Sequence, residues 1–589
     1  MIPLPLARIA EITSGALSGM ADPRAVVRGP VVIDSRAVEP GSLFVAFRGA
    51  RVDGHDYAAQ AIRAGAVAVL ATRPVDAPAV IVPDAAVALA ELAAAQVAAL
   101  PDATVIGVTG SAGKTSTKDL LARLTARIGP TIAPVGSFNN ELGHPLTVLR
   151  ADAGTRFMVL ELAARNLGHI KDLTRIAPPK IGVVLNVGTA HLGVFGGKEA
   201  IAKAKGELVE ALPRTGVAVL NADDPYVREM AARTDARVTY FGRGEDAAIR
   251  AEDVVVDVRG RASFTLRTPS GAAHVSLKLY GAHAVDNALA AAAAGYELGL
   301  PVATIAAELS EATPRSRWRM EVTDRADGVI VVNDAYNANP DSMRAAFEAF
   351  EVLGRGRRRF AVIAALRELG DEGPALNAEL GRMAGGAGLT GLIVAGPDAE
   401  PVLQGAHAAA HAPAPGAPHT PGPHAPAAQH APGPHPPAAQ HAPGPHPPAA
   451  QHAPGPQAPA AQHASGPQGP AWPAPVIPPQ GAPVPGPQDD APQGWQAPDA
   501  GVPQGRQGPE AGGAPAAGGP YAGGPPTVGG PPGGGGAAHP TRIVHVPDAE
   551  AAAAELNQWL RPGDAVLIKG PRAMGLERTA ELLLGGAAQ

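Results

Sequence analysis

One segment of the chain cannot fold as an ordinary globular domain. Residues 411–540 contain 37 prolines and 25 glycines, and neither residue type sits comfortably inside a helix or a strand. Ten of the 18 histidines also lie there, many of them in the unit APGPHPPAAQH and its variants, which recur every eleven residues. Such a composition cannot bury enough apolar surface to fold, so we predict a disordered, polyproline-biased loop. The alternative is weak metal binding or a partner motif provided by its histidines.

The other 459 of the 589 residues have the composition of a globular protein, enough for about three domains of roughly 150 residues each. There is no cysteine, so disulfides and Cys-based metal sites are excluded. A net charge of −6 argues against a dedicated nucleic-acid binder. The N-terminus does not have the pattern of a signal peptide, and we find no uncharged apolar stretch of about 18 residues. We therefore expect a cytoplasmic protein without a transmembrane segment.

Apolar runs and polar turns divide the globular part into units. Short strand-like runs and an Ala-rich helix that begins at Asp84 predict an N-terminal domain at residues 1–100. Strands that alternate with helices at residues 101–315 predict a second domain with a mainly parallel sheet. Within it, residues 254–279 have the pattern of two or three antiparallel strands. The fold class predicted for the whole chain is α/β.

The Pro/Gly-rich tract interrupts a third unit, which begins near Trp318. Fewer than 90 residues of this unit precede the tract and fewer than 50 follow it, and neither piece alone makes a comfortable core. We therefore predict one C-terminal domain in two parts, residues 316–404 and 541–589, with residues 405–540 as an insertion between them.

The strongest functional signal is GVTGSAGKTS at residues 107–116. An apolar strand leads into a glycine turn and a helix, an arrangement whose backbone N–H groups cradle phosphates. Lys114 is expected to reach the β- and γ-phosphates and Thr115 a magnesium ion. Val108 stands where the strict motif has its first glycine. The predicted nucleotide-binding residues are Gly110, Ser111, Ala112, Gly113, Lys114, Thr115 and Ser116.

Three further groups are candidates for metal or phosphate binding. Glu161 ends an apolar strand and His191 follows another, positions at which α/β sheets present ligands. Lys203 and Lys205 lie in the helical segment EAIAKAKGELVEAL. Each also has an ordinary explanation, as an exposed glutamate, a structural histidine or a solvated lysine. Their combination with a phosphate-binding loop is what points to catalysis.

Nine segments, in their order along the chain, resemble the ATP-dependent Mur ligases of peptidoglycan synthesis. They are DSRAVEPGSLFVAFRGARVDGHDY, TGSAGKTSTKD, SFNNELGHP, LELAARNLGHI, NVGTAHLGVFG, AKAKGE, GAHAVDNALAA and NDAYNANPDSM, followed by KGPRAMGLE near the C-terminus. The resemblance implies the three-domain architecture of the family, with a central P-loop ATPase domain and a Rossmann-like C-terminal domain. Within the family, YNANP is typical of the ligases that add D-alanyl-D-alanine to a UDP-N-acetylmuramoyl-tripeptide. ATP and two Mg²⁺ ions are the implied cofactors.

The resemblance also implies residue roles. Thr115, Glu161, His191 and Lys205 would serve the metal sites, with Lys205 carbamylated, and Lys114, Glu161, His191 and Lys205 would be catalytic. The remaining implied roles are nucleotide contacts by Asn287, Arg319, Asp334, Tyr336 and Asn337, and substrate contacts by Asp34, Ser35, Arg36, Asn139 and Asn140.

Two segments of the C-terminal domain depart from the family pattern. AALRELG at residues 364–370 replaces a segment close to GDMxELG, and Pro571 replaces a serine in KGPR. In this family the C-terminal domain receives the dipeptide. Alternative functions are another Mur-type or a folyl-polyglutamate-type amide ligase, or a non-catalytic ATP-binding scaffold that acts through its His/Pro tract. The family resemblance suggests a monomer.

Overall fold

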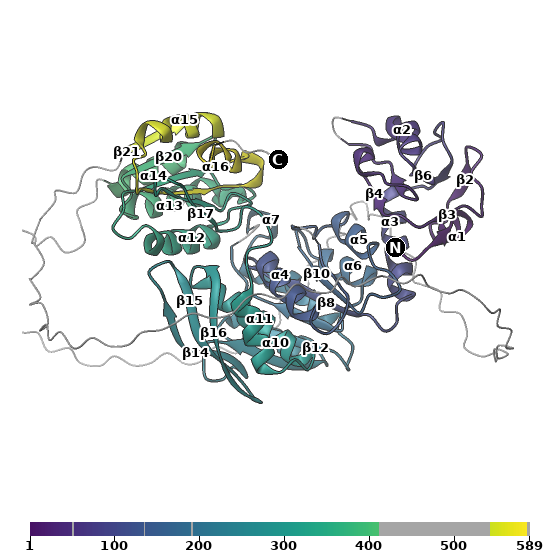
Figure 1. The fold of residues 1–589 in the computed structure, drawn as a ribbon, viewed down its shortest axis with the longest axis horizontal. Helices are drawn as coiled ribbons and strands as arrows, with labels where there is room; N and C mark the ends of the chain where they lie inside the picture. Colours follow the sequence, from purple (N-terminus) through teal and green to yellow (C-terminus); the bar gives the residue numbers. More distant parts are fainter. Residues whose placement is uncertain (50–51, 135, 190–191, 411–541, 586–589) are drawn as a thin grey trace, which may run out of the picture. The chain divides into compact units, whose positions relative to one another are not determined.

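The computed structural model describes residues 1–589 apart from 50–51, 135, 190–191, 411–541 and 586–589. The predictions for the Pro/Gly-rich tract and for His191 therefore lie outside the described residues. Sheets of five, nine and six strands, with a further two-stranded pair and many helices, form the described fold (Figure 1). The predicted α/β class is confirmed. None of the described helices is both long and apolar enough to cross a membrane.

The N-terminal sheet has the strand order β2-β7-β6-β5-β4, and its neighbours are parallel except for β2, which is antiparallel to β7. Asp84 caps α3 as predicted, since its carboxylate accepts the backbone N–H groups of Ala86 and Val87. The elements here are β1 (Leu4–Pro5), α1 (Leu6–Ile12), β2 (Ala16–Ser18), β3 (Val26–Val27), β4 (Val31–Val32), η1 (Ser35–Ala37), β5 (Leu43–Val45), η2 (Gly54–Tyr57), α2 (Ala58–Arg63), β6 (Ala68–Ala71), β7 (Ala79–Ile81) and α3 (Ala85–Ala98).

The central sheet has the order β16-β15-β14-β13-β12-β11-β8-β10-β9. Strands from β9 to β14 are parallel. β15 is antiparallel to both of its neighbours, β14 and β16, which confirms the prediction for residues 254–279. The strands are β8 (Thr104–Thr109), β9 (Thr131–Ile132), β10 (Phe157–Glu161), β11 (Ile181–Val184), β12 (Val217–Asn221), β13 (Arg237–Gly242), β14 (Ile249–Val256), β15 (Arg261–Thr268) and β16 (Gly271–Tyr280).

Helices cover this sheet, and α10 is a deeply buried one. Its run of alanines at 290–294 is completely buried, because small side chains let a helix approach its neighbours closely. The helix predicted after the glycine turn is α4, which ends at Thr125. The helices are α4 (Lys114–Thr125), α5 (Gly143–Val148), α6 (His169–Ile176), α7 (Leu192–Phe195), α8 (Lys198–Glu210), α9 (Pro225–Glu229), η3 (Met230–Arg233), α10 (His283–Glu297) and α11 (Val302–Glu311).

The third sheet combines residues from before and after the tract. Its order is β17-β18-β22-β19-β20-β21, and all neighbours are parallel except β17 and β18. β22 lies between β18 and β19, although the tract separates it from them in sequence; Figure 1 shows the yellow C-terminal elements beside the green ones. The strands are β17 (Glu321–Asp324), β18 (Ile330–Asn333), β19 (Arg359–Ala364), β20 (Gly391–Ala395), β21 (Arg542–Val546) and β22 (Ala565–Lys569).

Separate apolar clusters cover the two faces of the third sheet. Alternating side chains of β18 illustrate this, since Val332 belongs to one cluster and Val331 to the other, as expected for a parallel sheet buried on both sides. The helical elements are α12 (Pro340–Leu353), η4 (Gly370–Glu372), α13 (Gly373–Gly386), α14 (Glu400–Ala410), α15 (Ala549–Trp559), η5 (Arg572–Met574) and α16 (Glu577–Leu583).

Candidate functional site

The phosphate-binding loop joins the end of β8 to the start of α4. Gly113 precedes the helix with φ +81°, a conformation that favours glycine. A Cβ at this position would lie only 2.2 Å from Asn287 Oδ1, so the loop also needs glycine for space. Asn186 Oδ1 accepts the backbone N–H groups of Ser111 and Ala112, both at 2.9 Å. The end of β11 thus helps to shape the loop, a role that the sequence did not reveal.

Thr115 and Glu161 are in direct contact next to this loop. Thr115 Oγ1 donates to Glu161 Oε2 at 2.9 Å and lies 2.7 Å from Ser137 Oγ, while Asn139 Nδ2 donates to Glu161 Oε1 at 2.7 Å. Both Thr115 and Glu161 are almost completely buried. A carboxylate held by two neutral donors in a buried place presents its negative charge in a fixed position.

Lys114 lies near this carboxylate, and the buried Lys205 lies near Lys114. Lys114 Nζ donates to Gly110 O at 2.7 Å. The pKa of Lys114 is lowered, mainly by burial and also by the charge of Arg319, while the charge of Glu161 opposes this shift. Burial lowers the pKa of Lys205 well below its usual value, and the charge of Lys114 lowers it further. Lys203, two residues earlier on α8, is exposed. The structure therefore distinguishes the two lysines of the AKAKGE segment.

Residues just before β17 and just after β18 line the same cavity as the phosphate loop. Arg319 Nη2 donates to Ser137 Oγ at 2.8 Å, and the guanidinium carbon lies 4.2 Å from the centre of the Tyr336 ring. Asp334 Oδ2 forms an ion pair with Lys569 Nζ at 2.6 Å, and Asp334 Oδ1 accepts the backbone N–H of Met320 at 3.0 Å. Asp334, predicted to contact nucleotide, thus has two protein partners.

One cavity of about 1100 Å³ brings most of the predicted residues together. Gly110, Lys205, Asp34, Ser35 and Arg36 are not among the residues that line it. Fourteen predicted residues do line it: Ser111, Ala112, Gly113, Lys114, Thr115, Ser116, Asn139, Asn140, Glu161, Asn287, Arg319, Asp334, Tyr336 and Asn337. Ser137, Asn186, Trp318, Arg367, Lys569 and Arg572 line it as well without having been predicted. All of them except Trp318 and Arg367 lie in the segments that resemble the Mur ligase family, so that resemblance could have identified them.

Asp34, Ser35 and Arg36 lie at the end of β4 in the N-terminal sheet. The Asp34 carboxylate accepts from the Arg36 guanidinium at 2.7 and 2.9 Å and from the Arg36 backbone N–H at 2.9 Å. These hydrogen bonds lower the pKa of Asp34 to about 2, and those from the Arg36 side chain have the largest effect. Parallel strands present ligand sites at their carboxyl ends, so these residues occupy a suitable edge of their own sheet.

The described residues, which leave out His191, contain no group of three or more His, Asp or Glu side chains that could hold a metal ion. The donors that are present nevertheless suit Mg²⁺, which prefers a few protein oxygens together with substrate phosphates. Thr115 Oγ1 and Glu161 Oε2 are two such oxygens beside the phosphate loop.

Comparisons with known proteins agree with this geometry. Three family models match: "Mur ligase family, catalytic domain" at residues 30–112, "Mur ligase middle domain" at 108–295 and "Mur ligase, glutamate ligase domain" at 318–430. The UDP-N-acetylmuramoyl-tripeptide–D-alanyl-D-alanine ligase of Mycobacterium bovis is 48% identical over 426 residues, covering 67% of this chain and 84% of that protein.

Solved structures are similar too. A crystal structure of MurF from Acinetobacter baumannii has a TM-score of 0.61 at 32% identity, covering 69% of this chain and 88% of that one. The MurF ligase of Thermotoga maritima in complex with ADP has a TM-score of 0.63 at 24% identity, covering 95% and 98%. The matching sequence models, the phosphate loop and the shared fold lead to one conclusion: the chain belongs to the Mur ligase family.

Proposed function

We propose that this chain is an ATP-dependent ligase that joins D-alanyl-D-alanine to UDP-N-acetylmuramoyl-tripeptide in peptidoglycan precursor synthesis. The observation that carries the proposal is a large cavity in which the phosphate loop, Glu161 and Arg319 meet. Its volume of about 1100 Å³ can hold a nucleotide and a second reactant. The relative from Mycobacterium bovis carries the name of this reaction, and the related fold from Thermotoga maritima was solved with ADP.

The reaction follows from the charges of its substrates. A free carboxylate is a poor acyl donor because its leaving group would be oxide. Transfer of the γ-phosphoryl group of ATP to the carboxylate gives an acyl phosphate, whose leaving group is phosphate. The dipeptide amine then attacks the carbonyl carbon, and the tetrahedral intermediate releases phosphate to form the amide. No nucleophilic side chain is required.

The protein's part in this reaction is to hold like charges together. Lys114 and the N–H groups of the loop at 110–116 bind the triphosphate and reduce its repulsion with the carboxylate. Arg319 adds a second cation close to Ser137. Asn287 and Tyr336 bind the adenosine part of ATP, and Asn337 lies beside them. The backbone carbonyl of Asn337 accepts a hydrogen bond from Lys569 Nζ. Asp334 positions Lys569 through their ion pair.

Two Mg²⁺ ions are part of the proposal. Thr115, Glu161, His191 and carbamylated Lys205 would hold them, and the ions would supply positive charge at the transferring phosphoryl group. The burial of Lys205 favours its neutral amine, the form that reacts with CO₂. Asn139 orients Glu161 for this role through its hydrogen bond to Oε1.

The second substrate requires a cationic site, because D-alanyl-D-alanine carries a carboxylate. Arg367 and Arg572 line the cavity at the ends of β19 and β22. Arg367 forms an ion pair with Asp398 at 3.3 Å, and the Arg572 guanidinium lies 4.3 Å from the Trp318 ring centre. We assign the dipeptide carboxylate to these arginines, and the uridine nucleotide to the edge formed by Asp34, Ser35 and Arg36. All these substrates are water-soluble, which fits a monomeric enzyme of the cytoplasm.

A phosphate-release assay tests the proposal. With ATP and UDP-N-acetylmuramoyl-tripeptide present, D-alanyl-D-alanine should accelerate phosphate release far more than D-alanine or L-lysine does. Equal stimulation by a single amino acid would identify another amide ligase of the family. ATP binding without stimulated release by any acceptor would identify a non-catalytic scaffold.

A further inference from the structure

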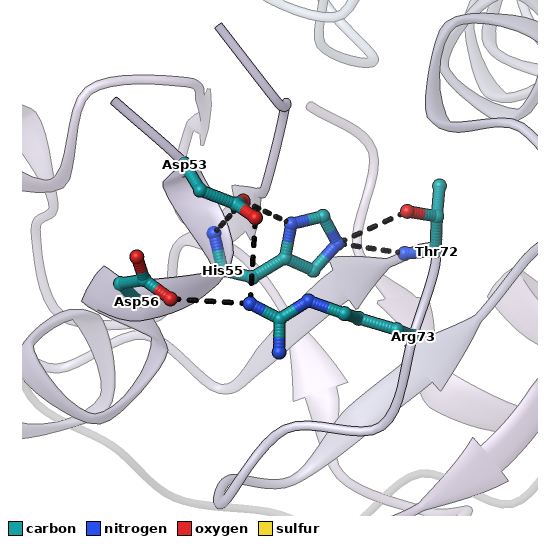
Figure 2. Close-up of polar contacts among 5 residues, drawn as sticks. All are labelled: Asp53, His55, Asp56, Thr72 and Arg73. Atoms are coloured by element: carbon teal, nitrogen blue, oxygen red, sulfur yellow. Dashed lines mark hydrogen bonds and ion pairs between the residues drawn. The ribbon is translucent and has the colours of Figure 1, made fainter. Parts of the chain in front are cut away.

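The side chain of His55 joins two neighbouring strand ends of the N-terminal sheet (Figure 2). His55 lies in η2, shortly after β5, and its side chain is only 3% exposed. Nδ1 lies 2.6 Å from Asp53 Oδ1, while Nε2 lies 3.0 Å from the backbone nitrogen of Thr72 and 3.1 Å from Thr72 Oγ1. Thr72 directly follows β6, the parallel neighbour of β5. Both ring nitrogens are therefore engaged.

The partners of the ring determine its protonation state. A backbone N–H can only donate, so Nε2 must offer its lone pair to Thr72. The proton of the neutral ring is then on Nδ1, which donates to the Asp53 carboxylate. A second proton on Nε2 would point at the N–H of Thr72 and break that hydrogen bond. The complete link between the two strand ends thus exists only with neutral His55.

The charged groups around His55 are Asp53, Asp56 and Arg73 (Figure 2). Asp53 also accepts the backbone N–H of His55 at 3.0 Å, and Arg73 Nη2 lies 3.4 Å from Asp53 Oδ2 and 3.1 Å from Asp56 Oδ1. Hydrogen bonds from His55 lower the pKa of Asp53 to about 2. The bond from the backbone N–H has the larger effect and the bond from the imidazole the smaller one. Asp53 is therefore an ionised acceptor at any pH at which the enzyme would be assayed.

Asp53 closes the loop that follows β5. Arg48 and Asp53 form an antiparallel bridge, and Gly49 N donates to Val52 O at 2.9 Å. β4, which leads into Asp34, is the parallel neighbour of β5 on the other side, with Val32 paired to Phe44. The carboxyl ends of β4, β5 and β6 thus lie side by side, the position at which open α/β sheets bind ligands. At this edge Arg36 pairs with Asp34, and Arg73 pairs with Asp53 and Asp56.

We propose that His55 is a positioning residue for the nucleotide-sugar substrate. Through Asp53 and Thr72 it fixes the ends of β5 and β6 and the bridge between Arg48 and Asp53, next to the end of β4 that leads into Asp34, without contacting the substrate itself. This inference rests on the proposed function and concerns one substrate only. Replacement of His55 weakens binding of the nucleotide sugar and leaves the ATP and dipeptide sites unchanged.

Steady-state kinetics of His55→Asn provide the test. The asparagine amide can still donate to Asp53, but it has no acceptor at the position of Nε2. The KM for UDP-N-acetylmuramoyl-tripeptide should rise about three- to tenfold, the equivalent of one lost hydrogen bond, while kcat and the KM for ATP stay within about twofold. Thr13→Val is the matched control, since it removes another buried hydrogen bond of the same domain, from Thr13 Oγ1 to Ile9 O. It should leave all three constants unchanged.

The split between KM and kcat distinguishes positioning from simple loss of stability, because a less stable enzyme would lose kcat as its folded fraction falls. A variant whose KM for the nucleotide sugar equals that of the wild type would overturn the inference.

Imidazole ¹⁵N spectra of the wild-type protein supply a test that needs no variant. They should show Nδ1 protonated and Nε2 unprotonated in His55 at about pH 8, and a proton on Nε2 would overturn the inference even if His55→Asn failed to fold. A wild-type protein without ligase turnover would refute the proposed function and this inference with it. Turnover in the wild type with an unchanged KM in His55→Asn would refute the role of His55 alone.

Discussion

Thr115 Oγ1 donates a hydrogen bond of 2.9 Å to Glu161 Oε2, although 46 positions separate the two residues in sequence. The contact exists because β8, which leads into the phosphate loop, and β10, which ends at Glu161, are adjacent parallel strands. Their carboxyl ends place a hydroxyl and a carboxylate side by side next to the nucleotide cradle. The first prediction follows from this pair.

Glu161→Gln keeps the size of the side chain and removes its charge. We expect kcat to fall by about 100-fold or more, because the Mg²⁺ ion proposed at the transferring phosphoryl group would lose its carboxylate ligand. The dissociation constant for ATP should change little, since the backbone cradle is intact. Stopped assays of phosphate release and nucleotide titrations measure the two effects. Glu210→Gln, at an exposed residue that pairs with Arg233, is the control and should retain full turnover.

Lys205→Ala should abolish ligase turnover if a carbamate on Lys205 supports the metal. Bicarbonate or short carboxylic acids should restore part of the turnover by supplying the missing carboxylate. Lys205→Arg should not be active, because a guanidinium keeps the positive charge that carbamylation removes. Lys203→Ala, on the exposed side of the same helix, is the control. Full activity of Lys205→Ala in a phosphate-release assay would rule out this assignment.

Arg367→Ala should raise the KM for D-alanyl-D-alanine about tenfold or more, because the dipeptide carboxylate would lose a charge-assisted hydrogen bond. The KM for ATP should stay unchanged. Arg382→Ala removes an exposed arginine of the same domain that pairs with Glu379 and should have no effect. An unchanged dipeptide KM in Arg367→Ala, measured at saturating ATP and nucleotide sugar, would assign the carboxylate to Arg572 instead.

His144 makes stability depend on pH. Burial lowers its pKa to about 4 from a usual value of 6.5. Between these values the unfolded chain binds a proton that the folded chain does not, so the free energy of unfolding falls as the pH drops through this window. The loss attributable to His144 is about 3 kcal/mol. Denaturant unfolding of the central domain at about pH 7 and about pH 4 should show a smaller loss in His144→Leu than in the wild type. Equal losses would contradict the assignment.

Replacing residues 411–538 by a short Gly/Ser bridge should leave ligase turnover within about twofold. Closing a flexible loop costs free energy that grows only logarithmically with length, so shortening should stabilise the protein by about 1–3 kcal/mol at most. Turnover of the full and shortened proteins, each with and without micromolar zinc, measures the effect. A large loss on shortening, or a zinc response that disappears with the tract, would mean that the tract regulates the enzyme.

The parts of the site that the sequence predicted are those made by local chain geometry. The phosphate loop could be recognised because strand, glycine turn and helix follow one another directly, and Gly113 is required by its own backbone conformation as well as by space. Glu161 could be predicted because a strand end is visible as the end of an apolar run. Asp84 could be predicted as a helix cap because its partners are two and three residues away.

The tertiary structure decided which side chains those local units meet. The sequence offers Lys203 and Lys205 on one helix, and only packing against the sheet buries Lys205 and leaves Lys203 exposed. Asp334 stays a predicted nucleotide contact. Its ion pair with Lys569 could not be predicted, because it arises only when β22 inserts between β18 and β19. The link from Asp53 through His55 to Thr72 likewise depends on two strands lying side by side. The periodicity of a sequence indicates which face of a helix or strand is apolar. The order of the strands in a sheet, however, arises from the packing of the whole core. These polar contacts depend on that order, so the sequence alone could not predict them.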